Sequence, residues 1–287
     1  MNKLKCASFF AGVGGIDLGF KNTGFFETTY ANEMDQFAVQ TYEKNFDTKV
    51  VCKDINLVEA KDITDFDVML GGFPCQAFSI AGKKEGFNDS KGRGELFFQL
   101  ERIFKEKQPK IIFLENVLSH DNGNTFKVIL DAITTAGYHV KYKVLNAAKY
   151  GNIPQGRERV YIIGFKDEQL YDNFTFPEEI PLTTTLHDII DFKSKIDDKY
   201  YYTPEKYSFY DTLTETITSM NTTYQWRRSA FVRENKKNIC FTLTASMGTG
   251  GHEVPLVLTE TGIRKLTPRE CFSLQGFPNT FMFPDLA

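Results

Sequence analysis

Short apolar segments alternate with amphipathic segments along the first 165 residues. Apolar, strand-like runs are predicted at Leu4–Phe10, Phe25–Ala31, Lys49–Cys52, Phe66–Leu70, Ile111–Leu114 and Val160–Phe165. Between them, apolar residues recur at helical spacing in Met34–Phe46, Glu95–Lys107 and Thr125–Ala136. This alternation predicts an α/β fold in which an open, mostly parallel sheet carries helices on both faces.

The alternation stops near residue 171. Prolines at positions 177, 181 and 204, clusters of Thr and Asp, and three consecutive tyrosines at 200–202 replace it. We therefore predict a smaller, irregular domain over residues 171–261. Residues 262–287, with a helix at Pro268–Leu274, are predicted to rejoin the first domain, which would comprise residues 1–170 and 262–287.

Composition excludes several classes of protein. Of the 287 residues, 41% are hydrophobic and 14% aromatic, which is enough for a core and too apolar for wholesale disorder. The longest apolar runs are far too short to cross a bilayer, so no membrane partner is expected. The five cysteines form no Cys-x-x-Cys pair, which argues against a disulfide scaffold or a zinc site and favours a reducing, cytoplasmic setting.

Charge is informative locally rather than overall. The formal net charge of −3 gives no general signature of nucleic-acid binding. Residues 225–240, however, carry five cationic side chains against the single acid Glu234, namely Arg227, Arg228, Arg233, Lys236 and Lys237. Both a solvated loop face and a nucleic-acid contact fit such a segment.

Ligands of open α/β sheets bind beyond the carboxyl ends of the strands, so the residues that follow each strand are the candidates for chemistry. The first strand leads into a turn that contains Gly12, Gly14 and Gly15. These glycines would let the backbone approach a ligand closely. The turn departs from the dinucleotide fingerprint, because Asp17 stands where a third glycine is expected. The glycine-rich segment can therefore be interpreted either as a cofactor-binding turn or as a turn with no ligand.

Acidic residues follow the second and third predicted strands. Glu33 comes about twenty residues after the glycine turn, where a carboxylate can accept hydrogen bonds from ribose hydroxyls. Asp54, followed by Ile55, can meet an adenine amino group. No Walker-type Gly-Lys-Ser/Thr is present to hold phosphates, so the pair fits a nucleoside without a phosphate chain. The alternative is a pair of exposed acids stabilised by helix dipoles.

The fourth and fifth strands end in residues with reactive side chains. Two glycines and Pro74 lead into Cys75 at the ligand edge of the sheet. Most free cysteines are inert packing residues, and we interpret the other four cysteines in that way. Glu115 follows an apolar strand, where partial desolvation would let it exchange a proton near neutral pH. Its alternative role is to cap the next segment.

Two arginines stand at the start of the last predicted strand. Arg157 and Arg159 are two residues apart, so on a strand they would share one face. Two guanidinium groups on that face can orient a carbonyl or a phosphate. A surface arginine pair is the alternative.

Taken in order, these residues resemble the motifs of bacterial DNA (cytosine-5) methyltransferases of restriction–modification type. The matching elements are Phe-Ala-Gly-Val-Gly-Gly at 10–15, Asn-Glu at 32–33, Asp-Ile at 54–55, Gly-Phe-Pro-Cys-Gln at 72–76, Glu-Asn-Val at 115–117, Gln-x-Arg-x-Arg at 155–159 and Arg-Lys-Leu-Thr-Pro-Arg-Glu at 264–270. The resemblance implies a Rossmann-like methyltransferase domain and a target-recognition domain over residues 171–261. It also implies that the chain methylates C5 of a cytosine in a specific duplex sequence.

The resemblance assigns a role to each motif residue. The cofactor, S-adenosyl-L-methionine, would lie against Phe10, Gly12, Gly14, Gly15, Ile16, Glu33, Asp54, Ile55, Pro74 and Leu96. Cys75 would be the nucleophile that adds to C6 of cytosine. Glu115 would contact N3 and the exocyclic amine, and Arg159 with Arg157 would hold O2. The cytosine would have to be flipped out, because a stacked base cannot reach these groups.

The basic segment falls where this family keeps its target-recognition region, which favours contact with double-stranded DNA. Arg can read guanine and Gln adenine in the major groove, whereas Lys mostly contacts phosphates. The expected DNA-binding residues are Gln76, Ser79, Gln225, Arg227, Arg228, Arg233, Lys236 and Lys237.

Two alternatives stay open. One is an RNA cytosine-5 methyltransferase, since a relative of the family methylates transfer RNA and charge does not decide between the substrates. The other follows from the end of the chain, because family members normally continue past Gln275–Pro278 to a segment that completes the cofactor pocket, whereas this sequence stops at Ala287. A shortened chain, a split enzyme with a complementing C-terminal chain, and an inactive DNA-binding remnant would each explain that ending. Otherwise a monomer is expected.

Overall fold

The computed structural model describes residues 2–74, 96–117, 123–227, 231–245, 247 and 254–284, without the side chains of 123–125. Cys75, Gln76, Ser79 and Arg228 therefore lie outside the described residues. The chain forms two compact units. The first comprises Met1–Val144, Arg159–Phe176 and Phe281–Ala287, and the second Leu145–Glu158 and Pro177–Thr280.

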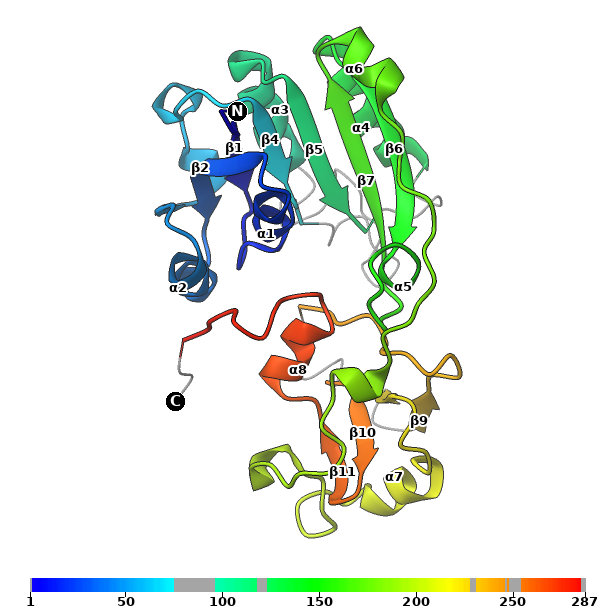
Figure 1. The fold of residues 1–287 in the computed structure, drawn as a ribbon. Coiled ribbons are helices and arrows are strands. Elements are labelled where there is room, and N and C mark those ends of the chain that lie inside the picture. Colours follow the sequence, from blue (N-terminus) through cyan, green and yellow to red (C-terminus); the bar gives the residue numbers. More distant parts are fainter. Residues whose placement is uncertain are drawn as a thin grey trace. The chain divides into compact units, whose positions relative to one another are not determined.

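A seven-stranded sheet forms the frame of the first unit (Figure 1). Its strands are β1 (Leu4–Phe9), β2 (Phe26–Glu33), β3 (Val50–Cys52), β4 (Val68–Gly71), β5 (Ile111–Asn116), β6 (His139–Asn146) and β7 (Glu158–Phe165). Their order is β3-β2-β1-β4-β5-β7-β6. The pairings among β1 to β5 are parallel, whereas β7 runs antiparallel to β5. The predicted α/β class with a mostly parallel sheet is confirmed.

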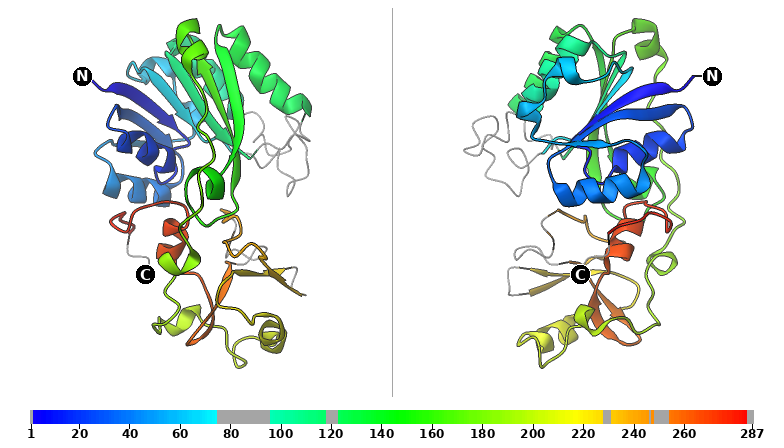
Figure 2. Two further views of the ribbon diagram at one scale, coloured as in Figure 1. Left: turned by 45° about the vertical axis from the view of Figure 1, so that its right-hand side comes forward. Right: turned by 90° about the vertical axis from the view of Figure 1, so that its left-hand side faces the viewer.

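Helices cover both faces of this sheet (Figure 2). They are α1 (Gly15–Asn22), α2 (Gln36–Asn45), α3 (Leu96–Lys107), α4 (Gly123–Thr135) and α6 (Glu168–Asn173), with short 3-10 turns at Ile55–Leu57 and Ala60–Asp62. Helix α2 begins after Asp35, whose carboxylate accepts hydrogen bonds from the backbone N–H groups of Phe37 and Ala38. Such an N-cap satisfies backbone donors that the first helical turn leaves unpaired.

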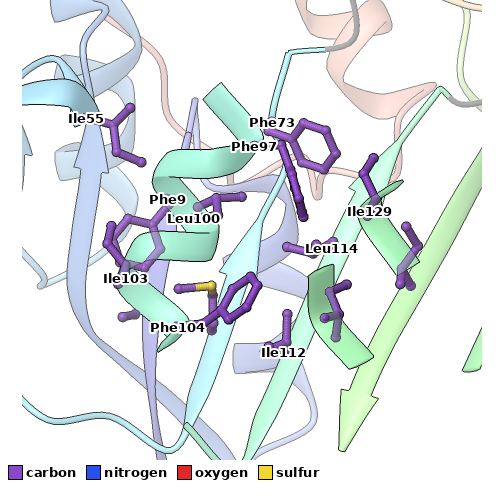
Figure 3. Close-up of a cluster of buried hydrophobic side chains, with 14 of the residues drawn as sticks. Phe9, Ile55, Phe73, Phe97, Leu100, Ile103, Phe104, Ile112, Leu114 and Ile129 are labelled. Carbon is purple, nitrogen blue, oxygen red and sulfur yellow. The ribbon is translucent and has the colours of Figure 1, made fainter. Parts of the chain in front are cut away.

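The core of the first unit follows from the alternation of side chains along the central strands. Phe9, Ile112 and Leu114 pack on one face against Leu100 and Ile103 of α3 (Figure 3). The intervening strand residues point the other way and pack with α1 in a second cluster that contains Cys6, Val68, Leu70, Ile16 and Phe20. Burial on both faces explains why these strands are nearly continuous apolar runs.

The second unit contains a four-stranded antiparallel sheet of order β11-β10-β8-β9. Its strands are β8 (Tyr224–Arg227), β9 (Phe231–Glu234), β10 (Leu256–Thr259) and β11 (Gly262–Lys265). Its helices are α5 (Ala147–Tyr150), α7 (Tyr210–Thr216) and α8 (Pro268–Ser273), with 3-10 turns at Leu186–Asp188 and Asp198–Tyr200.

Residues 262–280 belong to the second unit, whereas the sequence prediction grouped them with the first domain. The reason is that β11 pairs with β10 and that Leu266, Cys271 and Leu274 pack into an apolar cluster with Leu186 and Val257. The functional domain boundaries stay a prediction.

A buried ion pair joins β11 to α8. The side chain of Arg264 is fully buried, and its Nη1 and Nη2 lie 2.9 and 2.6 Å from the two carboxylate oxygens of Glu270. Glu270 also accepts hydrogen bonds from the backbone and hydroxyl of Thr267, the N-cap of α8. Each partner therefore compensates the burial of the other.

Removing one member of this pair leaves an uncompensated buried charge. We expect Glu270→Ala to lower the free energy of unfolding by about 3–5 kcal/mol. Urea denaturation measures the change. Glu260→Ala, at an exposed glutamate of the same unit, should change it by less than about 0.5 kcal/mol. Equal effects of the two substitutions would contradict this interpretation.

Candidate active site

The turn between β1 and α1 requires glycine at two positions. Gly12 and Gly14 have φ angles of 54° and 88°, in the left-handed region that glycine adopts without strain. A Cβ atom at Gly14 would collide with the ring of Phe46, which follows α2. At Gly12, none of the described atoms lies within 4 Å of the place a Cβ atom would take. The turn is therefore tight against α2 on one side and open beside Gly12.

Glu33 connects this turn to the end of β2. Its Oε2 accepts a hydrogen bond of 2.9 Å from the backbone N–H of Gly12. Its Oε1 accepts hydrogen bonds of 2.8 and 2.9 Å from the backbone N–H groups of Met34 and Asp35. The two motifs that the sequence analysis singled out thus meet, and the carboxylate is held in one orientation.

Asn32 brings the end of β3 to the same edge. Its buried side-chain amide donates to the carbonyl oxygens of Val51 and Lys53, at 2.9 and 2.8 Å. Asp54 follows directly and caps the 3-10 turn through the backbone N–H of Asn56. Residues after three neighbouring strands, β1, β2 and β3, therefore line one edge of the sheet. Ile55, the residue after Asp54, is buried in the apolar core.

A buried carboxylate holds the start of α1. Asp17 accepts hydrogen bonds from the hydroxyls of Ser8, Thr28 and Tyr42 at 2.8, 2.8 and 2.9 Å. These donors come from β1, β2 and α2, so one side chain joins three elements around the glycine turn. Burial raises the pKa of Asp17 above its ordinary value of 3.8, and the three hydroxyls act in the opposite direction.

Glu115 and Arg159 form an ion pair where β5 ends and β7 begins. Arg159 Nε lies 2.9 Å from Glu115 Oε1, and both side chains are largely buried. Gly72, just after β4, adjoins the pair, because a Cβ atom there would lie 3.7 Å from Glu115 Oε2. The same Cβ atom would lie 3.4 Å from Ile16 Cδ1, beside the glycine turn. The structure therefore brings the predicted catalytic carboxylate next to a predicted cofactor residue.

Asn116 fixes the chain that leads into the predicted nucleophile. Its amide donates to the carbonyl oxygen of Phe73 at 3.1 Å, and its side-chain oxygen accepts from Val117 N–H at 2.7 Å. The residue after Phe73 is Pro74, the last described residue before Cys75. Leu96, the first residue of α3, packs on the apolar core.

The prediction that Arg157 and Arg159 share one strand face is wrong. Strand β7 begins at Glu158, so Arg157 precedes it and falls in the second unit, whereas Arg159 falls in the first. Arg157 Nη1 donates to the carbonyl oxygen of Leu243 at 3.1 Å. The buried Gln155 also binds this unit, through Leu243 N–H and the carbonyl oxygen of Leu274. These bonds hold residues 155–157 in the second unit before the strand starts.

The basic segment includes most of the hairpin β8–β9 and the turn after it. Arg233, Lys236 and Lys237 are exposed, whereas Gln225 and Arg227 are partly buried. Among the residues that the structure describes, no group of His, Cys, Asp and Glu could hold a metal ion. No helix in the described ranges is long and apolar enough to span a membrane.

Sequence reasoning assigned no role to four residues that organise the site: Asp17, Asn32, Gly72 and Asn116. Three of them stand inside motifs that were recognised, next to Glu33, Phe73 or Glu115. Their importance comes from hydrogen bonds or close contacts with distant segments, which spacing along the chain does not reveal.

Comparison with known proteins agrees with the geometry. The family model described as C-5 cytosine-specific DNA methylase matches residues 4–287. The chain belongs to this family. It is 58% identical over 287 residues to the type II methyltransferase M.Bsp6I of Bacillus sp. (strain RFL6), covering 99% of this chain and 90% of that protein. The family resemblance inferred from the motifs is confirmed.

More distant relatives extend the match. The type II methyltransferase M.HaeII of Haemophilus aegyptius is 40% identical over 285 residues, covering 98% of this chain and 84% of that protein. The solved structure of the Entamoeba histolytica methyltransferase EhMeth covers 100% of this chain and 91% of its own, with a TM-score of 0.70 at 19% identity. That structure supports the fold alone. The family and the sequence relatives make this C-5 cytosine methylase a DNA methyltransferase, and the RNA and non-enzyme alternatives are not favoured.

The protonation of Asp17 gives this methylase a pH-dependent contribution to stability. Because the folded-state pKa lies above the unfolded value, that contribution is complete below about pH 4 and is lost as the pH rises through the folded-state pKa. We expect Asp17→Asn, which cannot ionise, to gain stability relative to the wild type as the pH rises above about 4. Urea denaturation at each pH measures the difference.

Asp47→Asn, at an exposed aspartate just after α2, serves as the control for this comparison. The difference in the free energy of unfolding between Asp47→Asn and the wild type should not rise with pH in the way expected for Asp17→Asn. A difference between Asp17→Asn and the wild type that stays constant with pH would contradict the account of the Asp17 cluster.

Proposed function

We propose that this enzyme transfers a methyl group from S-adenosyl-L-methionine to C5 of a cytosine flipped out of duplex DNA, within a restriction–modification system. The observation that carries the proposal is the Glu115–Arg159 ion pair, which adjoins Gly72, and Gly72 in turn adjoins Ile16 beside the glycine turn. A carboxylate and a guanidinium suited to a cytosine ring thus lie beside the place predicted for the methyl donor.

The described residues fit a nucleoside-containing cofactor. A carboxylate offers about four acceptor sites, and backbone N–H groups use three of those on Glu33, so a ribose hydroxyl can take another. Asp54 uses one oxygen to cap its 3-10 turn, and its second oxygen makes no hydrogen bond in the described part of the chain. That oxygen can accept from an adenine amino group. When bound, S-adenosyl-L-methionine supplies an electrophilic methyl group on a sulfonium sulfur.

For the remaining contacts with the cofactor, we propose the residues that the family motifs indicate. We place Phe10, Gly12, Gly14, Gly15 and Ile16 against the cofactor from the turn, with Ile55, Pro74 and Leu96 completing the pocket. The open space beside Gly12 supports this placement, because a close approach to the backbone is what glycine permits there.

In the proposed reaction, the thiolate of Cys75 adds to C6 of the cytosine. The electron pair of the C5–C6 double bond then becomes available at C5, which takes the methyl group. A base removes the proton from C5, the double bond re-forms and the thiolate leaves. Addition of the thiolate is what makes the otherwise weakly nucleophilic C5 reactive.

Glu115 and Arg159 stabilise the charge that develops on the ring. Because Arg159 Nε holds Oε1 of Glu115, the other oxygen, on the side of Gly72, is the one we assign to N3 and the exocyclic amine. Arg159 itself contacts O2. The motif assigns Arg157 to the same oxygen, and its Nη1 donates to the carbonyl oxygen of Leu243.

The setting follows from the relatives. Curated relatives of this chain are called type II methyltransferases, the modification enzymes of restriction–modification systems, which supports duplex DNA as substrate and the cytoplasm as location. Gln76, Ser79 and the basic segment of the second unit are assigned to the DNA. A complementing chain and the monomeric state stay predictions.

The mechanism predicts separate effects for the two catalytic side chains. Cys75→Ser should abolish the incorporation of tritiated methyl groups into duplex DNA, because the hydroxyl is a far weaker nucleophile than the thiolate. Glu115→Gln should slow the transfer about 10²–10⁴-fold, because it removes the group that handles the proton at N3. Incorporation of label per unit time measures both.

Cys52→Ser, at an exposed cysteine of β3, is the matched control and should retain the transfer rate. Undiminished transfer by Cys75→Ser would refute the covalent mechanism. If the enzyme methylated transfer RNA in preference to duplex DNA, the proposal that duplex DNA is the substrate would be refuted.

A further inference from the structure

The hairpin β8–β9 has one buried and one outward face. Opposite residues in an antiparallel pair share a face, and successive residues alternate between faces. Tyr224 and Trp226 lie on the buried face, where Tyr224 is fully buried and the ring of Trp226 stacks on Phe209 with centroids 4.4 Å apart. The outward face is then formed by the pairs Gln225–Arg233 and Arg227–Phe231.

Phe231 is an unexpected residue on this outward face. Phe231 is 48% exposed, whereas the other aromatic residues of the two strands are buried. Its neighbours on the face are cationic or amide side chains. The exposed guanidinium of Arg233 lies 5.2 Å from the ring centroid of Phe241, which restrains its orientation. In the described part of the chain, no hydrogen bond engages the side-chain amide of Gln225.

This face suits the major groove of DNA. The groove is about 12 Å wide and admits a two-stranded ribbon, and paired strands are about 5 Å apart. Cationic side chains complement the phosphates, and a restrained arginine can bind guanine through two hydrogen bonds. An exposed phenylalanine has no hydrogen bond to offer, but it can contact the methyl group of thymine.

We infer that β8–β9 is a β-ribbon that reads base edges with its outward face, and that Phe231 is a specificity-determining residue that recognises a thymine methyl group. The inference rests on the proposed function, since it concerns the DNA sequence at which that reaction occurs. Gln225 and Arg233 form the hydrogen bonds of this reading face. Phe231 provides the apolar contact of the same face. The charge pattern of the segment does not identify this residue.

Lys236 and Lys237 have a different task, because they lie in the turn after β9. The turn is fixed by hydrogen bonds from Asn235 N–H to the carbonyl oxygen of Thr223 and from Asn238 N–H to that of Asn235. Both lysines are exposed there. They contact phosphates, which adds affinity without sequence information.

The test selects duplexes from a randomised pool by binding and, separately, by methylation, and sequences both products. Phe231→Ala should lose the preference for thymine at one position by about fivefold or more and keep the rest of the recognised sequence. Arg233→Ala should relax a guanine position in the same way. Lys237→Ala should keep the whole sequence and reduce the slope of log K against log [salt] by about 0.9.

A second arm removes the methyl group from the DNA. Deoxyuridine in place of the thymine should weaken binding by the wild type several-fold and leave binding by Phe231→Ala unchanged. Glu234→Gln, on the same strand but on the opposite face, is the control and should behave as the wild type in both arms. Thermal unfolding of each variant shows that it is folded.

The outcomes separate this inference from the proposed function. Two results would overturn the role of Phe231. One is that Phe231→Ala selects the same bases as the wild type at every position. The other is that deoxyuridine weakens binding by the wild type and by Phe231→Ala equally. Failure of the wild type to select any duplex would overturn the ribbon as a reading surface. Selective binding without methylation would instead refute the proposed reaction and leave the ribbon supported.

Discussion

The ion pair between Glu115 and Arg159 is the interaction on which the rest of the site depends. It forms only because β7 runs antiparallel beside β5. This pairing brings Arg159, near the start of β7, to Glu115, near the end of β5. Gly72 leaves room next to the pair, and Ile16, in the first turn of α1, borders the same space. A side chain at position 72 would lie against both Ile16 and Glu115, the residues that we propose face the methyl donor and the base.

Buried polar side chains hold the segments around that pair in place. Asp17, Asn32 and Asn116 each join two or more strand ends or helices through hydrogen bonds to hydroxyls or backbone groups. A buried polar group is costly unless it is satisfied, so each bond specifies one arrangement of its segments. The edge of the sheet that carries the candidate site is therefore positioned by polar contacts as well as by the apolar core.

Much of the fold could be predicted from the sequence, because the central strands β1, β4 and β5 are nearly continuous apolar runs, and the six predicted strands lie within a few residues of those observed. Helix α1 was missed because Ile16, Leu18 and Phe20 alternate like a strand, whereas the helix is set by the turn at Gly14. Strand β6 was missed although Val140, Tyr142 and Val144 alternate with polar residues, as half-buried strands do. The direction of β7 and the position of Arg157 depend on long-range pairing, which local patterns do not encode.

The central claim is that the thiol of Cys75 bonds covalently to C6 of a cytosine in DNA. Mass spectrometry of the enzyme incubated with S-adenosyl-L-methionine and a duplex in which the target cytosine carries fluorine at C5 tests it most directly, because the final elimination cannot remove fluorine as a proton. The account predicts a stable adduct of enzyme, methyl group and DNA, with the peptide that contains Cys75 as the attachment point. Methylation of ordinary duplex DNA without any such adduct, or an adduct on another residue, would contradict it.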